Sequence, residues 1–212
     1  MQRVAINDLL RISWVDPAGS PTQAKHGISR SAIITIGQDA LERIFILECF
    51  VERCATTVLE QKILQTANKW KPRKFGIDVS GPQGMFFDTM RRRAREEGVT
   101  IHWEPQPSHH DKLFGIERGI EPVARAGRLF RPESKYCMPL YDEWRNFPDE
   151  KLNDGMDALA NAIRLLPSSM PEHYKQMDRE QLRRYLQRIG TPQNEIDERL
   201  RQHALNRSDD GI

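Results

Sequence analysis

Apolar and polar positions alternate along the first part of the chain in a way that predicts β-structure. Runs rich in β-branched residues predict strands at residues 9–15, 31–36 and 43–51. The short polar segment 37–42 joins the last two runs, so we expect an antiparallel hairpin. Residues 17–30 are rich in Gly, Ser and Pro and predict a loop after the first strand.

Helical and strand-like patterns then alternate as far as residue 166. Apolar residues at helical spacing predict helices at 56–70, 83–97, 111–126, 136–146 and 151–166. Short apolar runs predict strands at 75–79 and 100–104, with an edge strand at 127–132. Pro122 interrupts the third of these helices, so we expect a kink or two short helices there. This order predicts an α/β fold, with a mixed sheet and helices on its faces.

The chain changes character after the last of these helices. Further helical patterns lie at 178–189 and 191–203, and the Asp-x-x-Gln sequence at 178–181 fits a capping box. Few apolar residues serve the two helices, so we expect a hairpin that leans on the core or on a partner. The predicted organisation is a domain at 1–167 and a C-terminal helical tail at 168–212.

Composition restricts the classes of function. The chain has 212 residues, of which 38% are hydrophobic and 29% charged, as in a globular protein with one good core. No apolar run is long enough to span a bilayer, and the acidic Asp8 stands where a signal peptide has its apolar stretch. We therefore expect an intracellular protein without a membrane partner. The formal net charge of +2 does not by itself indicate nucleic-acid binding.

Cysteines, histidines and local basic clusters give weaker signals. An odd cysteine count without framework spacing predicts free thiols, rather than disulfides or a zinc site, at Cys49, Cys54 and Cys137. The His-His-Asp sequence at 109–111 could bind a transition metal or act as a base, but its Pro and Ser neighbours favour a loop that binds nothing. Basic clusters at 69–74 and 91–95 are expected to be solvated surface.

Four aspartates are placed where a metal ion could collect them. Asp16 ends the first predicted strand and Asp78 lies in a later one, so both face one end of the sheet if these strands are neighbours. Asp154 and Asp157 share a face of a helix, beside its apolar stripe. A buried carboxylate is costly unless it is paired or bound to a cation, and carboxylates from distant segments suit hard divalent metals. The pattern predicts a nuclease in which two Mg²⁺ or Mn²⁺ ions hold a phosphodiester for attack by water.

Each aspartate also has a simpler explanation. Asp16 before Pro-Ala-Gly fits a turn, and Asp78 could accept a hydrogen bond from a following backbone amide. Asp154 and Asp157 could cap or decorate a solvated helix. Only the order of the elements and the positions of all four acids, taken together, favour the metal site.

The combined pattern resembles the nuclease domain of the large terminase subunits of tailed phages, which are the motors that package DNA. The matching features lie between residues 11 and 166. They comprise Val-Asp-Pro-Ala-Gly at 15–19, Gly-Ile-Asp at 76–78, Lys112 with Arg118, Ala-Gly-Arg-Leu-Phe at 126–130, and Phe-Pro at 147–148 ahead of Asn-Asp-Gly-Met-Asp-Ala-Leu at 153–159. The resemblance implies a ribonuclease-H-like fold followed by the C-terminal helical hairpin.

The resemblance also assigns roles to residues. It implies that Asp16, Asp78 and Asp157 bind the metals and that Asp154 assists them. It further implies that Lys112 approaches the metals or the scissile phosphate, and that Lys112 and Arg118 contact nucleic acid. The implied substrate is concatemeric double-stranded DNA, cut in the cytoplasm of an infected bacterial host.

In an intact motor, the implied partners are an ATPase domain, a portal and a small terminase subunit. This sequence has no Gly-x-x-x-x-Gly-Lys-Ser/Thr loop to hold nucleotide phosphates. We therefore expect either an excised domain or a separate nuclease subunit, which does not hydrolyse ATP by itself.

Two other functions stay open. A Holliday-junction resolvase or a transposase of the same fold also uses clustered carboxylates, although no recognisable DNA-reading module supports the transposase. A non-catalytic docking module, with the helical tail as its contact surface, belongs to a different class. The presence of all the expected acids weighs against that last reading.

Overall fold

The structure of the chain is a computed structural model that divides into two compact units. It describes residues 5–18, 30–81, 83–107, 112–132, 134–148, 152–167, 178–188, 193, 196–197 and 200–201. Unit 1 comprises Met1–Leu9, Asp39–Glu42 and Pro167–Ile212, whereas unit 2 comprises Leu10–Gln38 and Arg43–Leu166. All the residues to which the sequence assigns chemistry belong to unit 2.

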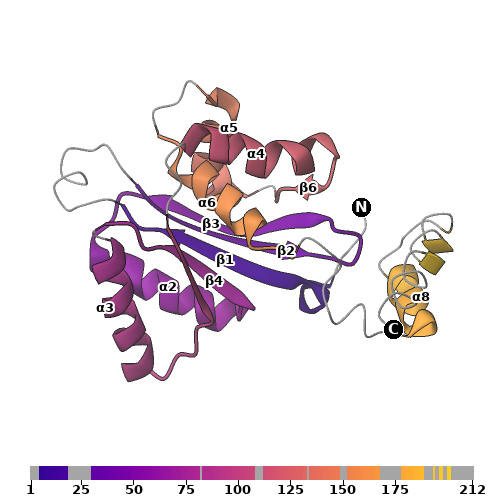
Figure 1. Cartoon of the computed structure of the whole chain (residues 1–212), viewed down its shortest axis with the longest axis horizontal. Coiled ribbons are helices and arrows are strands. Elements are labelled where there is room, and N and C mark those ends of the chain that lie inside the picture. Colours follow the sequence, from indigo (N-terminus) through magenta and orange to yellow (C-terminus); the bar gives the residue numbers. More distant parts are fainter. Residues whose placement is uncertain are drawn as a thin grey trace. The chain divides into compact units, whose positions relative to one another are not determined.

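Unit 2 is built on a mixed sheet (Figure 1). Its strands, in the spatial order β5-β4-β1-β2-β3-β6, are β1 (Leu10–Asp16), β2 (Ser31–Gln38), β3 (Ile44–Glu52), β4 (Lys74–Asp78), β5 (Trp103–Gln106) and β6 (Leu129–Phe130). Strand β2 is antiparallel to both β1 and β3, while β4 and β5 continue the sheet parallel to β1. Strand β6 adds a short parallel edge beside β3. The predicted hairpin and edge strand are thus confirmed.

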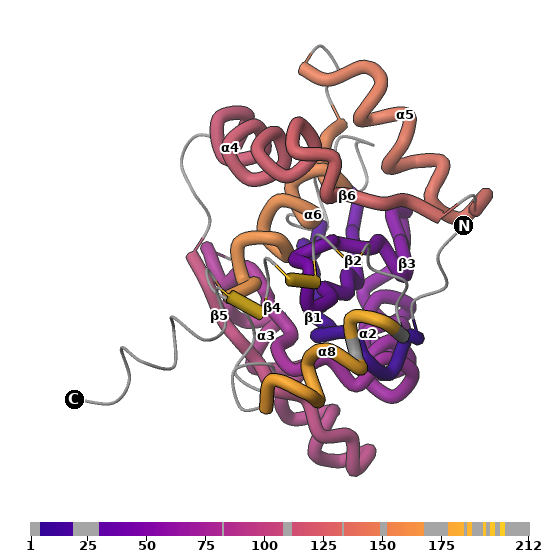
Figure 2. Tube along the Cα trace, turned by 90° about the vertical axis from the view of Figure 1, so that its right-hand side faces the viewer, coloured from indigo at the N-terminus to yellow at the C-terminus, as the bar shows by residue number. Residues whose placement is uncertain are grey.

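Helices cover both faces of this sheet (Figures 1 and 2). One face carries α2 (Thr56–Trp70) and α3 (Gln83–Glu96), and the other carries α4 (Lys112–Arg125), α5 (Met138–Asn146) and α6 (Asp154–Arg164). Side chains alternate across a strand, so β2 supplies both cores. Ile34 and Ile36 pack on the α6 side, and Ile33 packs on the α2 side. Strand β2 is therefore buried along its whole length, as expected of a strand covered on both faces.

Helix α4 corrects one prediction. It is a single helix with Pro122 inside it, so the expectation of two short helices is wrong. The proline removes one backbone hydrogen bond, but Ile116 and Ile120 are buried in the core. Helix α4 also approaches α6 so closely that a Cβ on Gly119 would lie 2.9 Å from the Cβ of Ala160. Packing against α6 therefore outweighs the loss at the proline.

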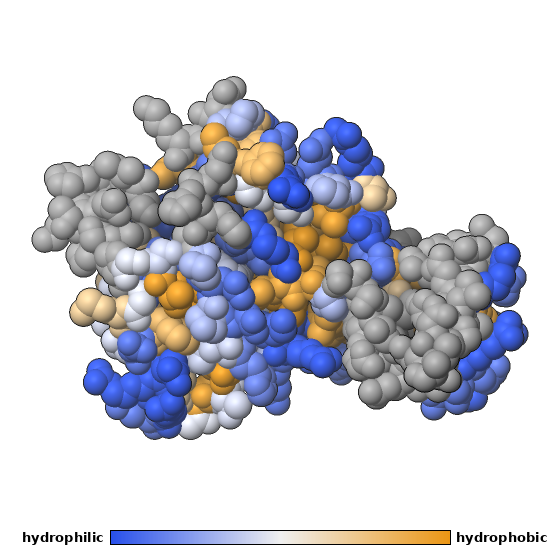
Figure 3. All heavy atoms as spheres, viewed as in Figure 1, coloured by the Kyte–Doolittle hydropathy of each residue, from blue (hydrophilic) through white to orange (hydrophobic). Residues whose placement is uncertain are grey.

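The basic cluster on α3 is solvated surface, as the sequence predicts. Hydrophilic side chains gather over the end of this helix (Figure 3). Arg93 pairs with Glu60 and with Glu97, and Arg92 Nε lies 3.8 Å from Glu96 Oε1. Arg92 and Arg93 are therefore paired with acidic side chains of α2 and at the end of α3.

Two absences can be stated for the described residues. All three cysteines are free, with Cys49 and Cys137 buried and Cys54 partly exposed, which confirms the expectation of free thiols. In the part of the chain that the structure describes, no helix combines the length and the apolar character needed to cross a membrane.

Unit 1 has an apolar cluster of its own. Unit 1 includes the short 3₁₀ helix η1 (Ile6–Asp8) and helix α8 (Arg179–Arg188). The cluster joins the tip of the β2–β3 hairpin to the tail, through Ala40, Leu41, Leu182, Leu186, Ile196 and Leu200. The tail therefore buries its few apolar residues against a segment that lies far away in the sequence.

The start of α8 shows the predicted capping box. The backbone amide of Gln181 donates to Asp178 Oδ1 at 2.7 Å, and the amide of Asp178 donates to Gln181 Oε1 at 2.9 Å. The second tail helix, expected at 191–203, lies largely outside the described residues.

Deleting residues 168–212 should leave unit 2 folded, because both of its cores are built from unit 2 residues alone. The loss of the tail exposes Leu41 and Ala40, which costs about 1–2 kcal/mol. We expect a Tm lower by roughly 2–8 °C in scanning calorimetry. Leu41→Ser in the full chain is the matched control and should lower the Tm by a similar amount. Loss of the cooperative transition would show that the tail is part of the core of unit 2.

Candidate metal centre

Two of the four aspartates end neighbouring strands. Asp16 is the last residue of β1, and Asp78 is the last residue of β4. The strands run parallel, with Val15 opposite Ile77, so the residues that follow this pair lie at the same edge of the sheet. Asp16 is 9% exposed and Asp78 is 8% exposed. The adjacency that the sequence could only assume is therefore confirmed.

Helix α6 supplies the other two aspartates. It packs over β1 and β2 on one face of the sheet. Asp154 is its first residue, and Asp157 follows three residues later, so both side chains lie on one face of the helix. Asn161, one turn further on, donates its Nδ2 to Asp157 Oδ1 at 3.2 Å. This hydrogen bond orients a carboxylate that the sequence predicts to be a ligand.

Lys112 joins aspartates from three positions in the chain. It is the first residue of α4. Its Nζ lies 3.0 Å from Asp154 Oδ1, 3.5 Å from Asp157 Oδ2 and 3.9 Å from Asp16 Oδ2. Burial lowers the pKa of Lys112, but the three carboxylates together raise it above its ordinary value. One cation therefore already offsets part of the negative charge of this group, which we call the aspartate cluster (Asp16, Asp78, Asp154 and Asp157).

Two members of the aspartate cluster resist ionisation. Burial raises the pKa of Asp16 well above its ordinary value, and the charges of Asp157, Asp154 and Asp78 raise it further, while Lys112 opposes the rise. The pKa of Asp157 is raised mainly by burial, again against the effect of Lys112. Buried carboxylates with raised pKa values are stabilised in their ionised form when a further cation approaches.

The carboxylates of the aspartate cluster are suitable ligands for a hard divalent metal ion. Their present arrangement is not yet that of a metal-binding site. Among the described residues, no three Asp, Glu, His or Cys side chains converge as metal ligands. The ammonium of Lys112 stands in for the cation between Asp16, Asp154 and Asp157. Carboxylate oxygens suit Mg²⁺ or Mn²⁺ and not a soft ion. Lys112 has to move aside before these three carboxylates can share a metal.

Glu143 and Arg30 belong to the site, and the sequence did not indicate them. Glu143 is 2% exposed and accepts hydrogen bonds from the amides of Gly155 at 3.2 Å and Met156 at 2.7 Å. Arg30 lies 2.5 Å from Glu143 through its NH2, and its backbone amide donates to Asp154 Oδ2 at 3.0 Å. Burial raises the pKa of Glu143 to about 7, against these hydrogen bonds and the charge of Arg30. The pair fixes the helix end that carries Asp154.

Two signals could have revealed Glu143. It lies within the apolar stripe of α5, between Leu140 and Trp144, where a glutamate needs a partner. Gly155 gives the second signal, because a Cβ there would lie 3.0 Å from Glu143 Oε2 and 2.9 Å from Val51 Cγ2. A glycine inside the final motif therefore makes room for the carboxylate that holds the helix.

Glu143→Ala should lower the free energy of unfolding by about 2–4 kcal/mol, because it leaves Arg30 without its partner and frees two buried amides. Glu143→Gln should lie between this variant and the wild type. Urea denaturation measures both. The control is Glu121→Ala, which removes an exposed partner of Arg125 on α4 and should cost no more than about 0.5 kcal/mol. Equal losses from Glu143→Ala and the control would refute this role of Glu143.

The remaining predicted residues lie as follows. Arg118 is exposed, and its guanidinium stacks on the ring of Phe114, 5.1 Å from the centroid, so it does not join the aspartate cluster. Asp78 Oδ1 accepts a hydrogen bond from the amide of Ser80 at 2.8 Å, which is the simpler role that the sequence allowed. The His-His-Asp sequence at 109–111 lies outside the described residues.

Comparison with known sequences gives little. No family model matches the chain. The curated protein SHORT ROOT IN SALT MEDIUM 1 of Arabidopsis thaliana is 25% identical over 126 residues, which is 56% of this chain and 9% of that protein. The chain therefore spans only a small part of the curated relative it matches, and this likeness assigns no family.

Comparison with solved structures identifies the fold. Two crystal structures of the large terminase nuclease from the thermophilic phage G20c, with bound zinc and with bound magnesium, match 76% and 74% of this chain. The matches cover 84% and 82% of those chains, with TM-scores of 0.54 and 0.51 and identities of 16% and 14%. The yeast mitochondrial Holliday junction resolvase matches 72% of this chain and 77% of its own, but its TM-score of 0.46 is too low to support an argument. This chain has the ribonuclease-H-like fold of phage large-terminase nucleases, as its motifs predicted.

Proposed function

We propose that this chain is a metal-dependent nuclease that hydrolyses phosphodiester bonds in DNA. The observation that carries the proposal is the convergence of Asp16, Asp154 and Asp157 on one cation, at the sheet edge where Asp78 also lies. A turn residue or a helix cap has no need of a shared cation. The fold supports the same conclusion, because the terminase nucleases that share it are themselves nucleases by name.

Some residues of the chain supply charge at the site, and others keep those residues in position. Metal ions held by these residues would activate water and stabilise the leaving oxygen. Asp16, Asp154 and Asp157 offer the oxygens, and Asp78 adds negative charge at the neighbouring strand end. Once displaced, the ammonium of Lys112 can neutralise a phosphate oxygen. Glu143 keeps α6, and with it two of the acids, in place.

Support for a role in DNA packaging comes from the motif resemblance and the terminase fold. In that role the substrate is concatemeric double-stranded DNA, the metal is Mg²⁺ or Mn²⁺, and Lys112 and Arg118 contact the nucleic acid. The partners are an ATPase domain, a portal and a small terminase subunit, in the cytoplasm of an infected bacterial host. A junction resolvase is the alternative that the fold leaves open.

A plasmid assay tests the proposal. Supercoiled DNA should be nicked in Mn²⁺ or Mg²⁺ and left intact in EDTA. A four-way junction beside linear duplex of the same sequence separates the two readings, since a resolvase cuts the junction much faster. No metal-dependent product from any of these substrates would refute the nuclease.

Cutting should be largely insensitive to sequence, and DNA affinity should fall steeply as salt rises. Phosphate contacts release counterions and read no bases. We expect a tenfold or greater loss of affinity between about 50 and 200 mM salt if several phosphates are contacted. Anisotropy with two unrelated duplexes measures this. A salt-resistant preference for one of them would show direct base reading instead.

A further inference from the structure

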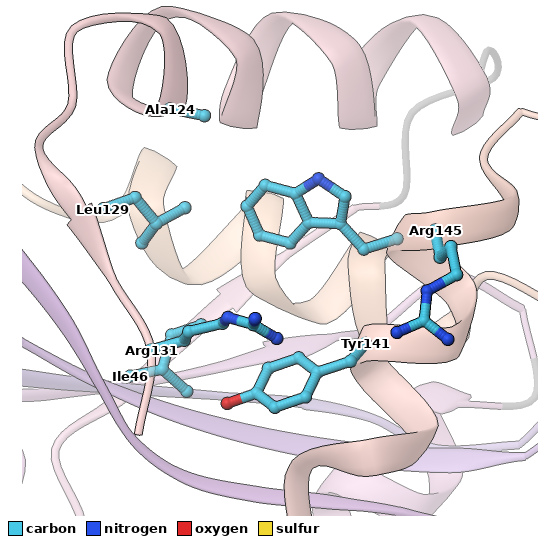
Figure 4. A pocket seen from close by; sticks show the side chains of 7 residues that line it. Ile46, Ala124, Leu129, Arg131, Tyr141 and Arg145 are labelled. Atoms are coloured by element: carbon cyan, nitrogen blue, oxygen red, sulfur yellow. The ribbon is translucent and has the colours of Figure 1, made fainter. Parts of the chain in front are cut away.

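A pocket of about 390 Å³ lies between α4, α5 and the sheet in unit 2 (Figure 4). Its lining comes from β3, α4, β6 with the residues after it, and α5, and comprises Ile46, Ala124, Leu129, Arg131, Tyr141, Trp144 and Arg145. Helix α4 rises about 18 Å between Lys112 and Ala124. The pocket is therefore separate from the aspartate cluster, to which the other end of the same helix belongs.

Flat aromatic surfaces and cations meet in this pocket. The guanidinium of Arg131 lies over the ring of Tyr141, 4.6 Å from its centroid (Figure 4). Tyr141 Oη donates to the carbonyl of Pro132 at 2.6 Å, which fixes the ring. The Arg145 side chain is 72% exposed, and among the described residues it forms a long ion pair, 3.9 Å, with the exposed Asp142. None of the described residues that line the pocket is acidic, so its charge favours an anion.

We propose that this pocket binds one unpaired nucleotide of a DNA strand, with the base against the half-buried Trp144 beside the Arg131–Tyr141 pair, and the phosphate on Arg131 and Arg145. The proposal rests on the proposed nuclease function, which makes nucleic acid the ligand of this chain. The volume of the pocket lies in the range of small-molecule sites and is too small for a DNA duplex. Aromatic rings beside arginines are the means by which proteins hold single strands, without selecting a sequence.

Fluorescence anisotropy of a labelled oligothymidine, roughly ten nucleotides long, tests the proposal in the absence of divalent metal. Arg131→Glu and Arg145→Glu remove the cations at exposed positions, where the fold tolerates the change. Ala124→Phe fills the pocket and leaves the charge unchanged. Each should weaken binding on the order of 5- to 100-fold, which corresponds to the loss of one stacked base. The control is Arg92→Glu on α3, the same charge change at a 74% exposed side chain, and it should have little effect.

The outcomes separate this pocket from general charge and from the nuclease itself. The proposal is overturned if Arg92→Glu weakens oligothymidine binding as much as the pocket variants do. It is also overturned if Ala124→Phe keeps the wild-type Tm and the wild-type affinity. Unchanged oligothymidine binding by Arg131→Glu and Arg145→Glu also overturns the proposal. That result is expected if the ligand of the pocket is an acidic peptide and not a nucleotide. Plasmid nicking is scored in parallel, and the control Arg92→Glu should nick like the wild type. If the wild type does not nick, the nuclease fails while the binding comparison still decides the pocket.

Discussion

Asp16→Asn, Asp78→Asn and Asp157→Asn should each reduce plasmid nicking by about three orders of magnitude or more. Under the proposed function, each substitution removes a charged oxygen from a site where bound metals would lower the barrier by several kcal/mol, and each 1.4 kcal/mol is a factor of ten in rate. Asparagine keeps the shape of the side chain, so the fold should persist. The initial rate of nicked-circle formation in Mn²⁺ measures the effect, and circular dichroism checks the fold.

Two further variants set the scale. Asp154→Asn should be milder, because this residue already accepts hydrogen bonds from the amide of Arg30 and from Lys112. Asp142→Asn, at an exposed aspartate on α5, is the matched control and should nick at the wild-type rate. Near-normal nicking by any of the three severe variants would remove that residue from the site. An inactive Asp154→Asn would make it a full ligand.

The central strands and α2 were predictable because local pattern and burial agree there. The sequence places α2 at 56–70, where the structure has it, since its apolar stripe repeats at helical spacing. Strand β5 starts later than predicted, at Trp103, because an edge strand is defined by its pairing with β4, and that pairing begins at Phe75 opposite Trp103. Of the two outcomes predicted at Pro122, the structure excludes two short helices, because packing against α6 keeps α4 continuous.

The members of the aspartate cluster could be named because strand ends and helix spacing are local properties, but the adjacency of β1 and β4 had to be assumed. The residues that support the cluster could not be named. Arg30 and Asp154 are 124 residues apart in the chain, and only the folded sheet brings them together. Glu143 appeared as one polar residue among apolar ones. The position of Lys112 followed from the family motif alone, and nothing local indicates that its ammonium meets three carboxylates.

Lys112→Met should destabilise the metal-free protein by about 1–3 kcal/mol, and saturating Mg²⁺ or Mn²⁺ should recover most of this loss. Without the ammonium, Asp16, Asp154 and Asp157 face one another with no counter-charge. Breaking a buried ion pair costs about 3–5 kcal/mol, and we lower that figure because the Lys112 side chain is 37% exposed and screened by solvent. Urea denaturation with EDTA and with metal measures the two states.

Lys62→Met is the matched control, because Lys62 Nζ lies 2.8 Å from Glu48 Oε1, outside the aspartate cluster. It should also lose stability, but metal should not restore it. The pH dependence gives a second check. Asp16 and Asp157 have folded pKa values above the unfolded value of 3.8, so the folded state takes up more protons as the pH falls toward that value. Proton uptake replaces the missing cation, and the deficit of Lys112→Met should therefore shrink in acid. A deficit that neither metal nor acid reduces would mean that Lys112 is not the counter-ion that a metal replaces.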